Sequence, residues 1–130
     1  MKTVFMGNHT VGVIVLRELI ALSEVQAVFA HPDHPDDGVV YQSVKQFAQD
    51  NGIPVYQYKA AEAGERSARI KTMAPDLIVV ADYRYLLEKD LIDIPRFGAI
   101  NFHPLLLPKY RGRAPVNWVI TNGEKKCGVT

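Results

Sequence analysis

The stretch DLIVVADY, residues 76–83, decides the fold class. Its centre is apolar without interruption, so polar side chains do not alternate with apolar ones along it. A strand of this kind is typical of a parallel sheet that is covered on both faces, because neither of its faces meets water. The stretch therefore predicts a central strand with helices packed on both sides.

Segments of strand and helix character alternate around this stretch. Thr10 is expected to cap the first helix, Asn51-Gly52 to end the second, and Pro115 to begin the last. The alternation predicts right-handed βαβ units, and hence an α/β fold with a doubly wound, mostly parallel sheet. Strand-type runs occur at residues 2–6, 25–30, 53–58 and 98–103, and helical spacing occurs at 10–20, 40–50, 61–73, 86–91 and 115–123.

The composition is that of an ordinary globular chain and argues against several classes of protein. With 130 residues, 48% of them hydrophobic and 22% charged, the chain suits a single domain. Its net charge of +1 shows no excess of basic residues of the kind that nucleic-acid binding needs. No apolar run reaches the roughly 18 residues of a membrane span, the first ten residues lack a signal-peptide pattern, and the single cysteine excludes an internal disulfide. We expect a cytoplasmic protein without membrane or nucleic-acid partners.

Three polar clusters follow predicted strands: Gly7–Thr10, Asp82–Tyr85 and Asn101–His103. In open α/β sheets, ligands bind beyond the carboxyl ends of the strands. Because the three clusters converge on that edge of the predicted sheet, they are the first candidates for a functional site.

The first cluster, with Asn8, His9 and Thr10, lies where a dinucleotide fold would carry its phosphate loop. It lacks the G-x-G-x-x-G spacing, and no acidic residue ends the second strand. A plain turn between strand and helix is therefore favoured over a nicotinamide site. The three residues remain weak candidates for contact with a substrate.

The composition of the loop at residues 31–38 resembles that of a metal site, because it contains His31, His34 and three aspartates. A proline follows each histidine, so the two imidazoles do not share one helical face. A solvated loop is favoured, and we expect no metal.

The second cluster, with Asp82 and Arg84, leaves two interpretations open. The pair can mark a strand edge that leaves the core, held by an ion pair. Alternatively, the cluster forms a pocket wall in which backbone groups of Tyr85–Leu87 meet a heterocyclic ring.

The third cluster places Asn101 and His103 two residues apart on one predicted buried strand, so both side chains point to the same face. Asn offers a neutral donor to a developing oxyanion, and His offers a proton near neutral pH. The pair therefore suits addition to a carbonyl, although a satisfied structural pair is the other possibility. The apolar run at residues 105–108 and the cations Lys109, Arg111 and Arg113 follow directly.

The stretch from Asn101 to Thr130, NFHPLLLPKYRGRAPVNWVITNGEKKCGVT, resembles the signature of the 10-formyltetrahydrofolate-dependent formyltransferases. MKTVFMG at the start, GIPVY and PDLIVVADYRYLL agree with this. The resemblance covers essentially all of the chain, and about two-thirds of the family's catalytic domain. It implies one formyltransferase-type domain at 1–130 that is truncated on its C-terminal side.

Within the family, the chain looks most like the sugar N-formyltransferases, which act on substrates such as UDP-4-amino-4-deoxy-L-arabinose. The segments that carry this likeness are LLPKYRGRAPVNWVITNGE, ADYRYLL and the MKTVFMGNH opening. The resemblance implies formyl transfer from 10-formyltetrahydrofolate to the amine of an amino sugar nucleotide. Methionyl-tRNA formyltransferase is the alternative, and glycinamide ribonucleotide formyltransferase comes third.

The resemblance also implies residue roles. Asn101 would hold the formyl oxygen and stabilise the oxyanion, and His103 would be the acid–base group. No metal and no covalent enzyme intermediate are needed. The cofactor would be bound by Tyr85, Leu86, Leu87, Leu105, Leu106, Leu107, Pro108 and Arg113.

Two departures from the family pattern limit these expectations. Pro104-Leu105 stands where many members carry a serine, so a hydroxyl near the cofactor is absent. The family's third catalytic residue, an aspartate, comes after Gly-Val-Thr and hence beyond Thr130. A non-catalytic fragment that binds folate or a nucleotide, and self-associates through an uncovered sheet edge, is therefore the hypothesis of another class.

Overall fold

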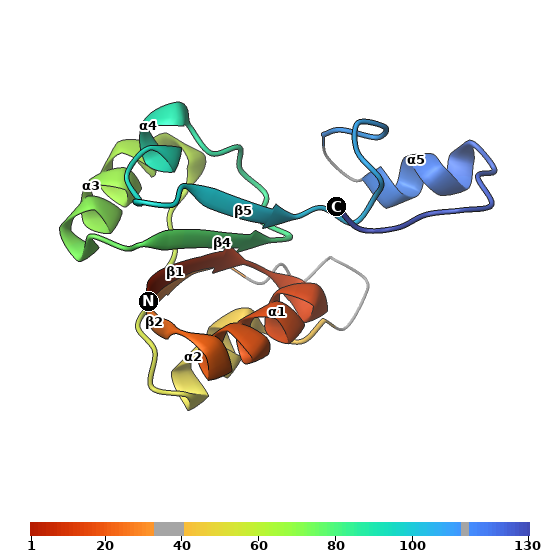
Figure 1. Ribbon diagram of the computed structural model, residues 1–130. Helices are drawn as coiled ribbons and strands as arrows, with labels where there is room; N and C mark the ends of the chain where they lie inside the picture. Colours follow the sequence, from red (N-terminus) through yellow and green to blue (C-terminus); the bar gives the residue numbers. More distant parts are fainter. Residues whose placement is uncertain (33–40, 113–114) are drawn as a thin grey trace. The chain divides into compact units, whose positions relative to one another are not determined.

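The computed structural model describes residues 1–32, 41–112 and 115–130 (Figure 1). The chain divides into two compact units, Met1–Ile100 and Asn101–Thr130, and each is described by itself. In the described residues, no helix is long and apolar enough to cross a membrane.

The first unit is built on a parallel sheet with the strand order β3-β2-β1-β4-β5. β1 pairs in parallel with both β2 and β4, and β2 pairs in parallel with β3. The chain first adds β2 and β3 on one side of β1 and then adds β4 and β5 on the other side, so the sheet is doubly wound. This confirms the predicted α/β class. The strands are β1 (Lys2–Gly7), β2 (Glu24–Phe29), β3 (Val55–Tyr56), β4 (Leu77–Ala81) and β5 (Ala99–Phe102).

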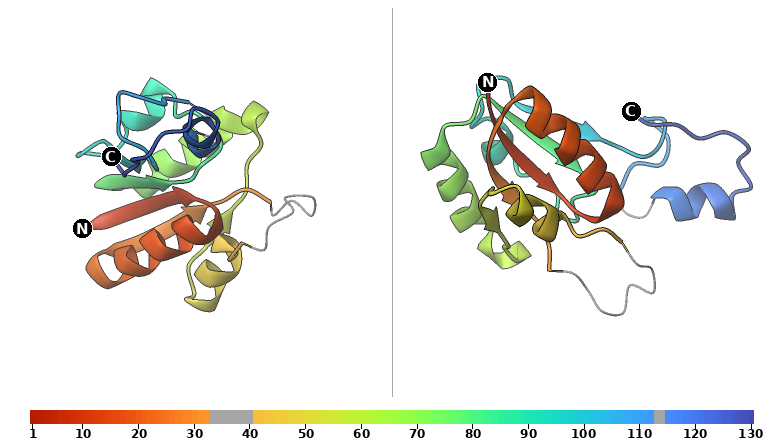
Figure 2. Two further views of the ribbon diagram at one scale, coloured as in Figure 1. Left: turned by 90° about the vertical axis from the view of Figure 1, so that its right-hand side faces the viewer. Right: turned by 90° about the horizontal axis from the view of Figure 1, so that it is seen from below.

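Helices cover both faces of this sheet (Figures 1 and 2). Phe5 of β1 belongs to the core on the side of α1 and α2, whereas its neighbours Val4 and Met6 belong to the core on the side of α3 and α4. Neighbouring residues of β1 therefore supply both cores in turn, as the alternation of side chains along a strand requires. The helices are α1 (His9–Leu22), α2 (Val44–Asp50), α3 (Ala63–Met73) after the short 3₁₀ turn η1 (Ala60–Glu62), and α4 (Lys89–Ile92).

The central strand agrees with its prediction, but the last strand does not. All five residues of β4 are buried, as the apolar stretch predicts. In β5, by contrast, Ile100 is 52% exposed and Phe102 41% exposed, so the expectation of a buried strand at residues 98–103 is wrong. The reason is position, because β5 lies at the end of the strand order beside β4 alone.

Three helix starts differ from the predicted ones. α1 begins at His9 with Asn8 as its N-cap, whereas Thr10 lies inside the helix and accepts a hydrogen bond from the Gln42 N–H. α2 begins at Val44, because the Ser43 side chain accepts a hydrogen bond from the N–H of Gln46 and caps the helix there. α4 begins only at Lys89, three residues later than expected. The second unit contains α5 (Pro115–Thr121), which begins at Pro115 as predicted.

A close approach between β1 and β4 requires a glycine at position 7. A Cβ atom there would lie 2.5 Å from the Ala81 carbonyl oxygen and 2.6 Å from the ring of Phe5. The backbones of the two strands therefore meet at Gly7 without room for a side chain.

We predict that Gly7→Ala lowers the free energy of unfolding by about 2–3 kcal/mol, because the obstructing atom is backbone and cannot rotate away. The matched control is Gly64→Ala in α3, where an added Cβ meets nothing within 4 Å. This control should stabilise the protein by about 0.5–1 kcal/mol through helix propensity. Urea unfolding measures both, and equal stability of the two variants would contradict the prediction.

Candidate functional site

Three polar residues lie in a row at the carboxyl edge of the sheet. The register pairs Met6 with Phe29 and Gly7 with Ala81. Continued past the strands, it places Asn8, the first residue after β1, between His31 and Asp82. The Asn8 N–H continues the ladder by donating to the Ala81 carbonyl at 3.2 Å. The sheet therefore brings the first and second polar clusters together.

His9 and Asp82 link the ends of β1 and β4. His9 Nδ1 lies 2.7 Å from an Asp82 carboxylate oxygen, and the His9 ring packs against Tyr41 at 4.1 Å between centroids. Both linked residues adopt left-handed backbone conformations, with φ of 57° and 55°. Such strain in residues other than glycine persists only where the surroundings hold it, and it is concentrated at functional sites. Asp82, for which one of the two open interpretations offered an ion pair with Arg84, is thus bound by His9.

His31 is buried at the end of β2, which corrects its assignment to a solvated loop. Its Nε2 accepts a hydrogen bond of 2.7 Å from the Arg84 N–H. The ring stacks on Tyr83, with centroids 4.6 Å apart, and meets Tyr85 edge-on at 4.8 Å. Burial, together with the charge of Arg84, lowers the pKa of His31 to about 4. The imidazole is therefore neutral at pH 7, and since Nε2 accepts, the ring proton is on Nδ1.

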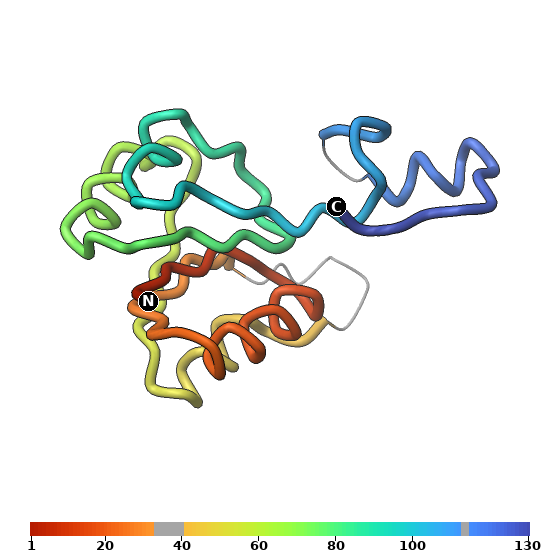
Figure 3. Tube along the Cα trace, viewed as in Figure 1, coloured from red at the N-terminus to blue at the C-terminus, as the bar shows by residue number. Residues whose placement is uncertain are grey.

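Arg66 of α3 binds the same segment from the other side. Its fully buried guanidinium lies 2.6 Å from a carboxylate oxygen of Glu88 and donates to the Tyr83 hydroxyl at 3.3 Å. Burial raises the pKa of that tyrosine. The anchored Glu88 adopts an extended backbone, which explains why α4 starts only after it. Figure 3 traces this segment from the carboxyl end of β4 to α4.

The predicted cofactor residues Tyr85, Leu86 and Leu87 lie within this anchored segment. The Leu87 side chain packs against the core on the α3 side, and Leu86 is 89% exposed. His31 and Arg66 fix the backbone just before and just after the three residues. Their contact with the cofactor stays a prediction.

The predicted catalytic residues belong to the second unit. Asn101 lies in β5 and is exposed, and His103 comes directly after the strand and is half-buried. His103 Nε2 lies 3.1 Å from the Tyr110 carbonyl oxygen. Because a carbonyl only accepts, Nε2 is the donor in this hydrogen bond.

Thr130 holds the loop that follows β5. Its backbone exchanges two hydrogen bonds with His103, at 2.8 and 3.0 Å. Its hydroxyl donates to the Leu105 carbonyl at 2.9 Å and accepts from the Leu107 N–H at 3.0 Å. The sequence pattern does not predict this role of Thr130, because the hydrogen bonds join residues that are more than twenty positions apart in the chain. The predicted cofactor side chains then differ in burial: Leu105 is buried, whereas Leu106, Leu107 and Pro108 are exposed.

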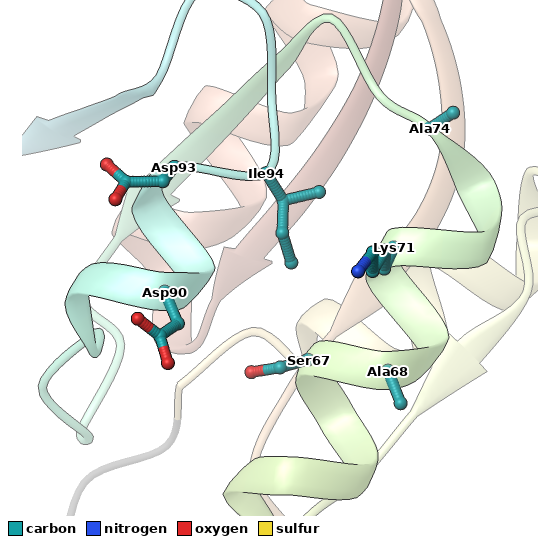
Figure 4. Close-up of a pocket in the computed structure, with 7 residues that line it drawn as sticks. All are labelled: Ser67, Ala68, Lys71, Ala74, Asp90, Asp93 and Ile94. Carbon is teal, nitrogen blue, oxygen red and sulfur yellow. The ribbon is translucent and has the colours of Figure 1, made fainter.

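Several expectations fall outside this arrangement. Arg113, His34 and the three aspartates beside His34 lie outside the described residues. Among the residues that are described, no group of three His, Cys, Asp or Glu side chains could hold a metal ion. A cavity of about 550 Å³ lies between α3 and α4, and none of the predicted site residues lines it (Figure 4).

We predict that Glu88→Gln destabilises the protein by about 2–4 kcal/mol, because it removes the carboxylate partner of a buried guanidinium. Glu18→Gln, an exposed change on α1, is the control and should stay within about 0.5 kcal/mol of the wild type. Denaturant unfolding compares the three proteins. A small effect of Glu88→Gln would show that Arg66 does not need this partner.

The depressed pKa of His31 predicts a pH dependence of stability. An unfolded chain protonates His31 near the ordinary value of 6.5, whereas the folded protein resists protonation until about pH 4. The unfolded state therefore binds more protons within this window, and the contribution of His31 is complete above it and lost as the pH falls through it. Urea unfolding between pH 7 and pH 4 should show a shallower loss of stability in His31→Gln than in the wild type. Identical pH profiles would contradict the assignment.

Comparison with known proteins identifies the family. Residues 5–130 match the family described as Formyl transferase. The methionyl-tRNA formyltransferases of Clostridioides difficile (strain 630) and Clostridium botulinum (strain Alaska E43 / Type E3) are each 45% identical over 134 residues, which include all of this chain. The chain spans 43% of the length of these relatives.

Solved structures show the same fold. Phosphoribosylglycinamide formyltransferase from Bacillus halodurans matches with a TM-score of 0.78 and 22% identity, covering 100% of this chain and 70% of that one. A formyltetrahydrofolate deformylase from Pseudomonas syringae pv. tomato matches with a TM-score of 0.74 and 21% identity, covering 99% of this chain and 44% of that one. The two solved structures support the fold. The family is supported by the match to the family model, which extends over nearly the whole sequence. The chain belongs to the formyl transferase family.

Proposed function

We propose that the protein containing this chain transfers a formyl group from 10-formyltetrahydrofolate to a primary amine. The observation that carries the proposal is the family match over residues 5–130, which includes the Asn101–His103 pair. A relative described as a formyltetrahydrofolate deformylase supports a donor of the folate type. Tyr85–Leu87 and Leu105–Pro108 are the proposed contacts with this donor.

Asn101 and His103 supply the chemistry that acyl transfer needs. The folate donor provides an activated formyl carbon for attack by the neutral amine. The Asn101 amide donates a hydrogen bond to the formyl oxygen as negative charge develops there, which lowers the barrier. His103 moves protons: the amine loses one as the new C–N bond forms, and the folate nitrogen gains one as the old C–N bond breaks.

The acceptor amine that the relatives support best is methionyl-tRNA. Both curated relatives act on it according to their names, and each is 45% identical to this chain. This support ranks the alternative from the sequence above the amino sugar nucleotide that was expected first. The remaining length of the relatives leaves room for tRNA contacts outside this chain.

An amino sugar nucleotide stays the second candidate acceptor. The specific observation in its favour is the net charge of +1, since a tRNA reader needs basic surface to neutralise phosphates. Self-association through β5, which lies at the edge of the sheet, also remains a proposal.

The decisive assay offers both acceptors to the expressed protein, at the full length of its reading frame, together with 10-formyltetrahydrofolate. We expect formyl transfer to methionyl-tRNA to exceed transfer to a 4-amino sugar nucleotide. The opposite preference would restore the sugar assignment. Folate binding without any turnover would favour the non-catalytic hypothesis.

We further predict that His103→Ala lowers kcat by about 10²–10⁴-fold, the usual contribution of general acid–base catalysis. Folate binding should stay within about twofold, because the predicted cofactor contacts lie elsewhere. Lys109→Ala, a nearby exposed change, is the control and should retain activity. Wild-type activity in His103→Ala would refute the assigned role.

A further inference from the structure

Two buried polar atoms at the carboxyl edge of the sheet lack a hydrogen-bond partner among the described residues: Asn8 Oδ1 and His31 Nδ1. The two residues are only 3% and 2% exposed. Buried polar groups are nearly always satisfied, and an unsatisfied one costs free energy unless water or a ligand supplies the missing bond. Two such atoms at the ligand-binding edge of an α/β sheet therefore point to a bound group.

The strand register places the two residues just beyond the ends of the neighbouring strands β1 and β2. Asn8 and His31 each lie two residues beyond the Met6–Phe29 pair of β1 and β2, and adjacent strands are about 4.8 Å apart. The Asn8 backbone is already used, since its N–H donates to Ala81 and its carbonyl accepts from Gly12. Its side chain is therefore the part left for a ligand.

The two atoms have opposite and fixed roles. His31 Nε2 accepts from the Arg84 N–H, so Nδ1 carries the ring proton and acts only as a donor. Asn8 Oδ1 acts only as an acceptor. The register therefore puts an uncharged donor and an uncharged acceptor just beyond the ends of two neighbouring strands.

This pairing selects the chemistry of the ligand. A phosphate or carboxylate would accept from His31 but repel the Asn8 oxygen, and an ammonium group would do the reverse. A hydroxyl accepts one hydrogen bond and donates another, so it satisfies both atoms.

We propose that Asn8 and His31 form a subsite for a sugar hydroxyl of the acceptor. The assignment rests on the proposed formyl transfer only for the identity of the ligand, which is taken to be the acceptor of the formyl group. The hydroxyl comes either from the terminal ribose of an aminoacyl-tRNA or from the pyranose of an amino sugar nucleotide. Because both atoms are covered in the free protein, binding requires a side-chain movement. Tyr85, half-buried and edge-on to His31, is the ring placed to make it.

Two substitutions at position 31 separate a ligand contact from a structural role. The amide of His31→Gln reaches the place of Nε2, so it can still accept from the Arg84 N–H but loses the donor at Nδ1. The amide of His31→Asn occupies the place of Nδ1, so it keeps the donor but loses the bond to Arg84. A subsite predicts that Gln weakens binding while stability is preserved, and that Asn does the reverse.

Calorimetric titration of the full-length protein uses two pairs of probes. One pair is the stable amide 3′-methionylamino-3′-deoxyadenosine with its 2′-deoxy counterpart, and the other is a uridine diphosphate 4-amino-4-deoxypentose with its ring-deoxy counterpart. For the pair that supplies the ligand, the wild type should bind the hydroxyl form about 5–10-fold more tightly, the range expected from one or two neutral hydrogen bonds. His31→Gln and Asn8→Ala should abolish this preference.

The outcomes separate the subsite from the proposed function. If the protein transfers formyl groups but neither pair shows a hydroxyl preference, the subsite is refuted and the function stands. If a preference that depends on His31 appears without formyl transfer, the subsite stands and the function fails. If His31→Asn, rather than His31→Gln, loses the preference while both variants remain folded, the role of the residue is structural and the proposal is overturned.

Discussion

The carboxyl edge of the sheet depends on the close approach of β1 and β4 at Gly7. A side chain at this position would clash with the Ala81 carbonyl, so only glycine lets the two backbones meet and the ladder continue to Asn8. This alignment sets Asn8 between His31 and Asp82. The polar row is therefore a consequence of backbone packing, and a shift of β1 against β4 would separate its members.

The segment after β4 is held from three directions. His9 binds Asp82, His31 accepts from the Arg84 N–H, and Arg66 binds Glu88. Each anchor comes from a different element: the start of α1, the end of β2 and the middle of α3. A short segment with three independent anchors loses little freedom when it binds a ligand, which is the physical advantage of a preorganised site. This is the segment proposed to meet the folate donor.

The sequence was sufficient for the fold class and for the family, whereas the roles of the predicted site residues stay predictions. Continuous apolar character predicted the buried β4, and the polar pair at Asn101 and His103 led to the family that the comparison identifies. His31 and Arg66 were missed, because burial of a histidine followed by proline, or of an arginine in a polar helix, depends on tertiary contacts that local spacing does not record. The exposure of β5 was missed for a related reason, since apolar character does not reveal that a strand lies at an edge. The same rule that singled out Asn101 and His103, polar residues at the end of a buried strand, would have selected His31.

The most direct test of this account is the protonation state of His31. ¹⁵N NMR of the selectively labelled imidazole, recorded from pH 7 to pH 5, distinguishes the two neutral tautomers and the charged form. The account predicts a neutral ring throughout this range, with the proton on Nδ1 and with Nε2 accepting from Arg84. A ring that titrates near the ordinary pKa of 6.5, or that carries its proton on Nε2, would contradict both the anchored segment and the sugar-hydroxyl subsite.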